Sequence, residues 1–455
     1  MPDNDLTIKN ARILQDDRIV DAEISIHHGK IVHVGRILTT YGSILDAKGA
    51  LVLPAGIDSH VHFREPGYKQ KEDWHTGSCA AAAGGITTVI EHPNTYPPTV
   101  DAAYFKEKLK KAKNKSVVDF ALNAGVIGDS DYFDNNLKHL SKMWEAGACA
   151  FGEIFMATST GNMAIDKNML HRALNEIKEL DAIACIHAED EVYMKRADEV
   201  ERYSDGYSRM RPNIAEAFAV GAAIDLAKDN RLHLCHISAR ESIGMIRQAR
   251  SLGRENITCE VAPHHLMLHM GDWERLGPFG KMNPPLRNRG STKAMWNALN
   301  DGTIDILASD HAPHTIDEKT MNVWDAPAGV PGVETMYPLM LAAVKNNLVH
   351  LSRVVDAISR RPGEIFSLAG KGRLEAGYDA DLIFVNSKDI APIEAVKLHS
   401  KCKWTPYEGM DAIFPYMVFA NGEVVWDGDD IVAKPGSGEF IAGAGFGIVK
   451  EPDGA

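Results

Sequence analysis

The chain has 455 residues, of which 45% are hydrophobic and 24% are charged, and its formal net charge is −13 at pH 7. This length and composition predict a soluble globular protein with one large domain and a smaller one. The negative charge argues against a general affinity for nucleic acid or for anionic membranes, so the expected partner is a small molecule.

The N-terminal run MPDNDLTIKN lacks the cationic start and the apolar core of a signal peptide, and no apolar stretch reaches 18 residues. We therefore expect a cytoplasmic protein. Several of the six cysteines, among them Cys185, Cys235 and Cys259, lie in apolar runs, and no C-x-x-C spacing occurs. Reduced, structural thiols are the simplest interpretation.

Both ends of the chain carry short alternating patterns typical of β-strands. We predict that residues 1–54 and 371–455 together form a small β-sandwich domain, with a partly ordered tail after Trp426. A hairpin signal, Asn421-Gly422, lies in the second segment. The strand-like runs are 6–14, 22–35, 43–54, 372–386 and 416–428.

Between these ends, in residues 55–370, apolar strand candidates alternate with helical patterns. The strand candidates are 56–63, 86–93, 118–127, 148–157, 182–189, 231–238, 257–265 and 304–311, and the clearest helical runs are 72–85, 102–113, 168–180, 215–228 and 291–302. This alternation predicts an α/β fold, a (β/α)₈ TIM barrel. An open doubly wound sheet would usually have a glycine-rich turn after its first strand, whereas Gly84-Gly85 follows a helix.

The first of these runs carries His60 and His62. Residues two apart on a strand face the same way, so the two imidazoles can bind one metal ion. Such a pair alone is weak evidence, because most are surface or core histidines. Its weight comes from further strand-end residues, His187, His236 and Asp310.

In a barrel these strand ends converge at one mouth. Imidazoles with a carboxylate form a borderline-soft ligand set that suits Zn²⁺ better than Mg²⁺ or Ca²⁺, with other first-row divalent ions as substitutes. The sequence therefore predicts a metal centre built from these five residues.

Several segments together resemble the dihydroorotase branch of the amidohydrolase superfamily, and the resemblance covers nearly the whole chain. They are HVHFREPG, GGITTVIEHPNTYP, IHAED, LHLCHIS, CEVAPHHL, KMNPPLR and SDHAPHT. Shorter pieces are shared with allantoinases and hydantoinases. Arg64, Asn94 and His314 look like the more particular dihydroorotase signature.

The resemblance implies a hydrolase of cyclic amide bonds that interconverts N-carbamoyl-L-aspartate and L-dihydroorotate in pyrimidine biosynthesis. It implies that His60, His62, His187 and His236 are metal ligands and that Asp310 is both a ligand and the general base. A bound Zn²⁺ lowers the pKa of its water to about 7, and the resulting hydroxide attacks the amide carbonyl.

The resemblance also implies that Arg64, Asn94 and His314 hold the substrate carboxylate, for which a guanidinium is well suited. Asn283, in KMNPPLR, would contact the substrate ring, although a plain turn explains it equally well. The family is usually homo-oligomeric, which we expect here too.

One position departs from the family pattern. Many relatives carry a carboxylated lysine that bridges two metals, and here Glu153 stands in its place. Glutamate keeps the negative charge but reaches roughly 3–4 Å less far, which puts the usual bridge in doubt. The site would hold one metal at His60 and His62, or two drawn together by Glu153 or water, or it is degraded.

Three alternatives remain open at this stage: a dihydroorotase, an allantoinase or hydantoinase, and a noncatalytic relative that serves as an assembly subunit. Three further histidines, His92, His264 and His265, are interpreted as mainly structural. The loop 326–335 is expected near the pocket, where it could act as a lid.

Overall fold

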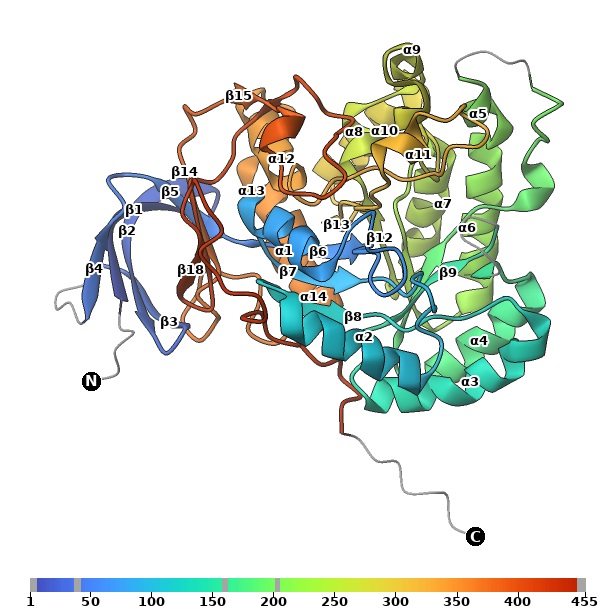
Figure 1. Ribbon diagram of the computed structural model, residues 1–455, viewed down its shortest axis with the longest axis horizontal. Helices are drawn as coiled ribbons and strands as arrows, with labels where there is room; N and C mark the ends of the chain where they lie inside the picture. Colours follow the sequence, from blue (N-terminus) through green and yellow to red (C-terminus); the bar gives the residue numbers. More distant parts are fainter. Residues whose placement is uncertain (1–5, 37–41, 158–162, 201–204, 448–455) are drawn as a thin grey trace, which may run out of the picture.

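The computed structural model describes residues 6–36, 42–157, 163–200 and 205–447 (Figure 1). Its centre is a ring of parallel strands: β6 (Gly56–Val61), β7 (Ile86–Glu91), β8 (Asp119–Leu122), β9 (Phe151–Phe155), β10 (Ile183–His187), β11 (Arg231–Leu234), β12 (Ile257–Val261) and β13 (Ile306–Leu307). Each of these strands falls inside a segment predicted from the sequence. Almost all of their residues are buried, which explains why they read as continuous apolar runs.

Hydrogen bonding divides the ring into a three-stranded sheet, β6-β7-β8, and a five-stranded sheet, β9 to β13. Two isolated parallel bridges join the sheets, Ala124 with Phe151 and Val61 with His311. The strands therefore close on themselves, as the predicted barrel requires.

Helices surround the ring (Figure 1). They are α1 (Trp74–Ala83), α2 (Ala102–Lys115), α3 (Ser130–Glu145), α4 (Lys167–Glu179), α5 (Gly206–Met210), α6 (Asn213–Ala227), α7 (Arg240–Ser251), α8 (Pro263–Met267), α9 (Trp273–Leu276), α10 (Arg289–Asn300), α11 (Ile316–Lys319), α12 (Met336–Lys345), α13 (Leu351–Val355) and α14 (Arg361–Ile365). The sequence analysis identified α1, α2, α4, α6 and α10. Among the described residues, no helix is long and apolar enough to span a membrane.

Strands from both ends of the chain form one eight-stranded sheet beside the barrel (Figure 1). It contains β1 (Leu6–Gln15), β2 (Arg18–His27), β3 (Lys30–Gly35), β4 (Ser43–Asp46), β5 (Leu51–Pro54), β14 (Leu382–Val385), β17 (Met417–Ala420) and β18 (Glu423–Trp426). Strand β1 pairs with both β4 and β5, so the sheet branches and encloses its own apolar core. The domain boundaries after residues 54 and 370 stay predictions.

The signal Asn421-Gly422 is confirmed as a hairpin turn between β17 and β18, with both residues at positive φ. A short pair, β15 (Ala391–Pro392) and β16 (Asp411–Ala412), precedes it. Beyond Trp426 the chain returns to the barrel, where Ile441 N–H donates to the Phe120 carbonyl. The tail is therefore ordered through residue 447, and residues 448–455 lie outside the described residues.

A buried ammonium group ties the terminal sheet to the barrel. Lys371 Nζ lies 2.5 Å from Asp119, 2.9 Å from Asp381 and 3.0 Å from Asp379, and it donates to Asn421 Oδ1 at 3.0 Å. Asp119 begins β8, whereas Asp381 precedes β14. Burial opposes the charged form, but the surrounding carboxylates raise the pKa of Lys371.

We predict that Lys371→Met destabilises the fold by about 3–5 kcal/mol, because it leaves several carboxylates buried without their cation. Urea denaturation, monitored by circular dichroism, measures the change in the free energy of unfolding. Lys30→Met is the matched control, since Lys30 pairs with Asp379 from a half-exposed position, and it should cost about 1 kcal/mol or less. Equal destabilisation by the two variants would contradict the role of Lys371 as the buried link between the terminal sheet and the barrel.

Candidate metal centre and substrate pocket

The barrel strands bring the predicted ligands to one end of the ring. His60 lies in β6 and His62 directly follows it, His187 ends β10, His236 lies two residues after β11, and Asp310 lies three residues after β13. All five side chains are buried. His236 and Asp310 adopt positive φ values of 31° and 47°, a conformation that costs about 1–3 kcal/mol for a non-glycine residue and is often found at functional sites.

Glu153, in β9, stands between the two pairs of histidines. Its Oε2 lies 3.5 Å from His60 Nε2 and 3.8 Å from His62 Nε2. Its Oε1 lies 2.9 Å from His187 Nδ1 and 2.7 Å from His236 Nε2. One carboxylate therefore faces both pairs, although its side chain is shorter than a carboxylated lysine.

The preceding glycine is one reason why the shorter side chain reaches. At Gly152, φ is 144°, and a Cβ placed there would overlap the carbonyl oxygen of Cys185 in β10. Strand β9 can approach β10 this closely only because position 152 has no side chain. The close approach carries Glu153 toward the middle of the site.

Asp310 completes the centre on the side of His60 and His62. Its Oδ1 lies 3.3 Å from His62 Nε2 and 3.7 Å from His60 Nε2. Burial opposes ionisation, but the hydrogen bond from His62 and the charge of His60 lower the pKa of Asp310. Asp310 is therefore an ionised carboxylate, able to bind a cation or accept a proton.

The donor set fits a metal ion. His60 Nδ1 lies 2.6 Å from Glu260 Oε1, so its proton points at that carboxylate. Its Nε2 is buried and has no hydrogen-bond partner among the described residues. A histidine held on one nitrogen by a carboxylate, with the other nitrogen aimed at a ligand cluster, is the usual arrangement in metal sites.

Among the described residues, three groups of potential ligand atoms emerge: His60, His62 and Glu153; Glu153, His187 and His236; and His60, Cys235 and Glu260. The first two share Glu153. Burial raises the pKa of Glu153, but the charge of His60 and hydrogen bonds from His187 and His236 hold it well below the ordinary value. The shared carboxylate therefore stays ionised.

His187 also has a carboxylate behind it. Its Nε2 lies 2.9 Å from Glu189 Oε2, and Arg211 Nη2 binds the same oxygen at 2.5 Å. Burial lowers the pKa of His187, but the hydrogen bonds and charges of Glu153 and Glu189 outweigh burial and raise this pKa to about 9. Sequence reasoning missed Glu189, Arg211 and Glu260.

A cavity of about 260 Å³ opens beside the centre. The substrate residues proposed from the sequence, Arg64, Asn94, Asn283 and His314, all line it, together with Asp310. Lys71 and Tyr68, which sequence reasoning missed, line it too, as do residues 327–329 of the loop 326–335. No motion of that loop is tested, so its role as a lid stays a prediction.

Contacts fix the polar groups of this cavity. Arg64 Nε donates to the Pro313 carbonyl at 3.2 Å, and its Nη2 lies 3.2 Å from His314 Nε2. On the other side, Tyr207 donates its hydroxyl proton to Asn283 Oδ1 at 2.7 Å. The pocket therefore combines a guanidinium and side-chain amides next to the predicted metal ligands.

The three histidines interpreted from the sequence as mainly structural, His92, His264 and His265, are all buried, and that interpretation stays a prediction. His92 stacks on His60 with 3.9 Å between ring centroids, and its Nε2 lies 3.3 Å from the Ser59 carbonyl. His265 Nε2 donates to the Pro284 carbonyl at 3.0 Å. His264 is buried, with neither ring nitrogen hydrogen-bonded within the described part of the chain.

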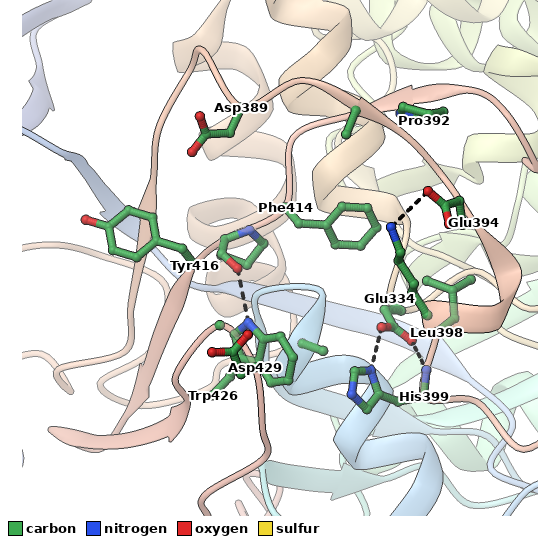
Figure 2. A pocket seen from close by; sticks show the side chains of 15 residues that line it. Glu334, Asp389, Pro392, Glu394, Leu398, His399, Phe414, Tyr416, Trp426 and Asp429 are labelled. Carbon is green, nitrogen blue, oxygen red and sulfur yellow. Dashed lines mark hydrogen bonds and ion pairs between the residues drawn. The ribbon is translucent and has the colours of Figure 1, made fainter.

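A second cavity, of about 530 Å³, lies away from the histidine cluster, between the end of α1, Glu334 just before α12, and the segment around residues 389–429. Figure 2 shows Glu334 and His399 on its wall, where the His399 ring and backbone N–H both bond the Glu334 carboxylate at 2.7 Å. None of the metal-ligating, catalytic or substrate-binding residues predicted from the sequence lines this cavity, although Glu334 of the loop 326–335 does. It is therefore separate from the metal centre.

The closed barrel and the buried histidine and carboxylate cluster define a metal-dependent hydrolase site of the amidohydrolase type. The sequence model of the amidohydrolase family matches residues 51–425. This chain belongs to that family.

Individual relatives agree with this membership. The chain is 52% identical to a dihydroorotase of Methanosarcina acetivorans, over 97% of this chain and 96% of the relative. It is 42% identical to a dihydroorotase of Halobacterium salinarum, over 85% and 88%. Among solved structures, L-hydantoinase from Arthrobacter aurescens superposes with a TM-score of 0.91 at 31% identity, over 96% and 99% of the two chains.

We predict that Glu260→Gln weakens metal binding by about 10- to 100-fold, because a neutral amide orients His60 less firmly. Competition with a chromogenic zinc chelator measures the affinity. The control is Glu216→Gln, which alters a buried carboxylate bound to Arg287 and Ser238 and should leave metal affinity unchanged. Equal losses in both variants would assign Glu260 a general structural role.

Proposed function

We propose that this chain is a dihydroorotase that interconverts N-carbamoyl-L-aspartate and L-dihydroorotate. The observation that carries the proposal is the placement of Arg64 in the same small cavity as Asp310 and Glu153. A guanidinium binds a carboxylate through two parallel hydrogen bonds, and the cavity has the size of a small molecule. The 52% identity to a dihydroorotase supports the same choice.

We also propose that the cofactor is zinc, with two ions. His60 and His62 would hold one ion, His187 and His236 the other, and Glu153 would be shared by both. Imidazole with carboxylate ligands suits Zn²⁺. When bound, the metal activates a water molecule and polarises the amide carbonyl.

The protein side chains then have separate tasks. Arg64 and Asn94 hold the substrate carboxylate, with His314 beside them, and Asn283 contacts the ring. Asp310 accepts a proton on the nucleophilic side and returns it to the leaving nitrogen. In the direction of ring closure, the same carboxylate works in the reverse order.

A hydantoinase-type activity is the second candidate, because the fold superposes over nearly its full length on an L-hydantoinase. The position of Glu153 between both histidine pairs supports a working centre over a degraded assembly subunit. A cytoplasmic location and a homo-oligomeric state stay predictions.

The first test compares substrates. Zinc-loaded protein should hydrolyse dihydroorotate in preference to dihydrouracil, hydantoin and allantoin, and chelation should abolish the activity. Turnover of the uncharged rings without turnover of dihydroorotate would reject the proposal. Protein that binds no zinc and gains no activity when zinc is added would also reject it.

The second test concerns the carboxylate. We predict that Arg64→Met raises KM for dihydroorotate by about 10- to 100-fold, since a hydrogen bond between charged groups contributes about 1.5–3 kcal/mol. Steady-state kinetics at saturating substrate should show a smaller change in kcat. An unchanged KM would mean that another group holds the carboxylate.

A further inference from the structure

Lys71 is a cation in the substrate cavity that the proposed function leaves unexplained. It follows β6 by ten residues, and its side chain is 13% exposed and lines the same cavity as Arg64 and Asp310. Its Nζ lies 3.0 Å from His314 Nδ1, 2.8 Å from Glu318 Oε1 and 5.3 Å from the centre of the Tyr68 ring. An ammonium group has three N–H donors, so these two polar partners leave one for a ligand.

The partners of His314 define its protonation. Its Nε2 lies 2.9 Å from the Ala328 carbonyl, which can only accept, so Nε2 carries the proton. Its Nδ1 therefore has a lone pair and accepts from Lys71. Burial, together with the charges of Arg64 and Lys71, lowers the pKa of His314 to about 3, although the nearby Glu318 carboxylate favours the protonated ring. His314 is thus a neutral ring whose nitrogens both have partners.

This arrangement changes how the carboxylate is held. A neutral His314 with its only N–H directed at Ala328 has no donor left for a substrate carboxylate. It lies instead between two cations. Lys71 Nζ donates to Nδ1 at 3.0 Å, whereas Arg64 Nη2 lies 3.2 Å from the protonated Nε2, a contact without a hydrogen bond. The ring separates the two charges and orients Lys71.

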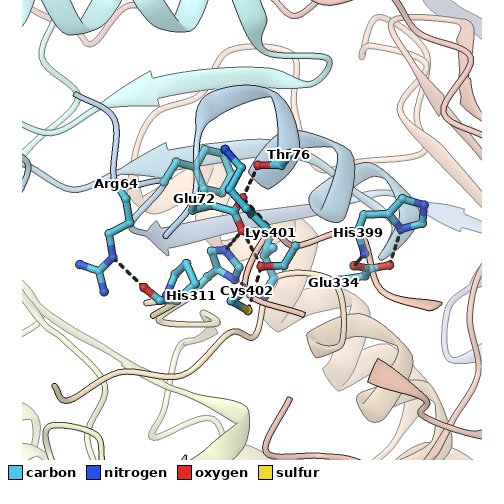
Figure 3. Close-up of polar contacts among 12 residues, drawn as sticks. Arg64, Glu72, Thr76, His311, Glu334, His399, Lys401 and Cys402 are labelled. Atoms are coloured by element: carbon cyan, nitrogen blue, oxygen red, sulfur yellow. Dashed lines mark hydrogen bonds and ion pairs between the residues drawn. The ribbon is translucent and has the colours of Figure 1, made fainter. Parts of the chain in front are cut away.

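The backbone next to Lys71 is firmly anchored. The adjacent Glu72 is buried and binds Ser400 Oγ at 2.5 Å, and it also accepts the backbone N–H of Lys401. Figure 3 shows this carboxylate among Thr76, His311 and Lys401, with Arg64 close by. The histidine in this group, His311, directly follows Asp310. Lys71 therefore extends from a rigid support into the cavity.

We infer that Lys71 determines substrate specificity, as the second cation, with Arg64, that binds the carboxylate of the cyclic amide, and that His314 is a positioning residue for Lys71. This inference rests on the proposed function. Two cations that converge on one side of a small cavity favour a ring with an anionic substituent over an uncharged ring of the same size. The alternative is a structural role in which Lys71 only links its loop to α11 through Glu318.

The test uses zinc-loaded, full-length protein with Lys71→Met and Lys71→Arg. For Lys71→Met we expect KM for dihydroorotate, and Ki for orotate as a competitive inhibitor, to rise about tenfold or more, with kcat changed less than threefold. Lys71→Arg should restore most of the affinity because it restores the charge. Turnover of uncharged dihydrouracil or hydantoin should not fall.

Lys69→Met is the matched control. Lys69 lies on the same loop with a side chain that is 58% exposed and pairs with Glu65, so all kinetic constants should stay at the wild-type value. Metal content and circular dichroism of each variant show whether the centre and the fold are intact, and Lys71→Gln replaces Lys71→Met if the latter does not fold.

An unchanged KM for dihydroorotate in Lys71→Met would overturn the inference. Parallel losses for charged and uncharged substrates, without rescue by arginine, would also overturn it, since they indicate a structural role. Failure of the proposed function looks different, because the wild-type protein itself would then not hydrolyse dihydroorotate.

Discussion

The structure depends on the burial of one negative charge, the Glu153 carboxylate, at the end of the barrel. A buried carboxylate is costly unless charges or hydrogen bonds compensate for it. Here the compensation comes from imidazoles in or just after β6, β10 and β11, two facing each oxygen. Without a metal ion, His60 and His187 balance the charge by holding protons, because burial lowers the pKa of each ring but the adjacent carboxylates outweigh it and raise the pKa, that of His187 to about 9. A bound cation would replace those protons, so metal binding and the neutralisation of the buried Glu153 carboxylate are coupled.

The next shell of contacts fixes the rings around that carboxylate. Glu260 holds His60 on the nitrogen that points away from the centre, and Glu189 holds His187 in the same manner. Glu189 is in turn neutralised by Arg211. An imidazole held at one ring nitrogen exposes only the other nitrogen to the centre. The side-chain conformation of each predicted ligand is therefore fixed before a metal ion binds. This pairing also explains why so many ionised groups can be buried at one end of the molecule.

The sequence predicted the barrel because its strands are short apolar runs separated by helices, and it predicted His187 and Asp310 because each follows such a run. It could not predict Glu260 as a partner of His60, since the two are 200 positions apart and only ring closure brings them together. A partial signal exists, because Glu260 is a charge inside the apolar strand ITCEV and Glu189 lies two residues after His187, on the same face. Lys71 gave no signal, because in sequence it is one of many lysines in a polar loop.

The charges of the cavity also determine how a substrate lies within it. Arg64 and Lys71 lie on either side of His314, while three of the proposed metal ligands, Glu153, His187 and Asp310, also line the cavity. A ring that carries a carboxylate could bind in two orientations, because a bound metal ion would attract the carboxylate just as the two cations do. One ammonium would compete poorly with a divalent ion for that group. Under the proposed function, a guanidinium and an ammonium together would offer more charge and a fixed geometry. They would draw the carboxylate away from the metal and leave the amide bond facing Asp310.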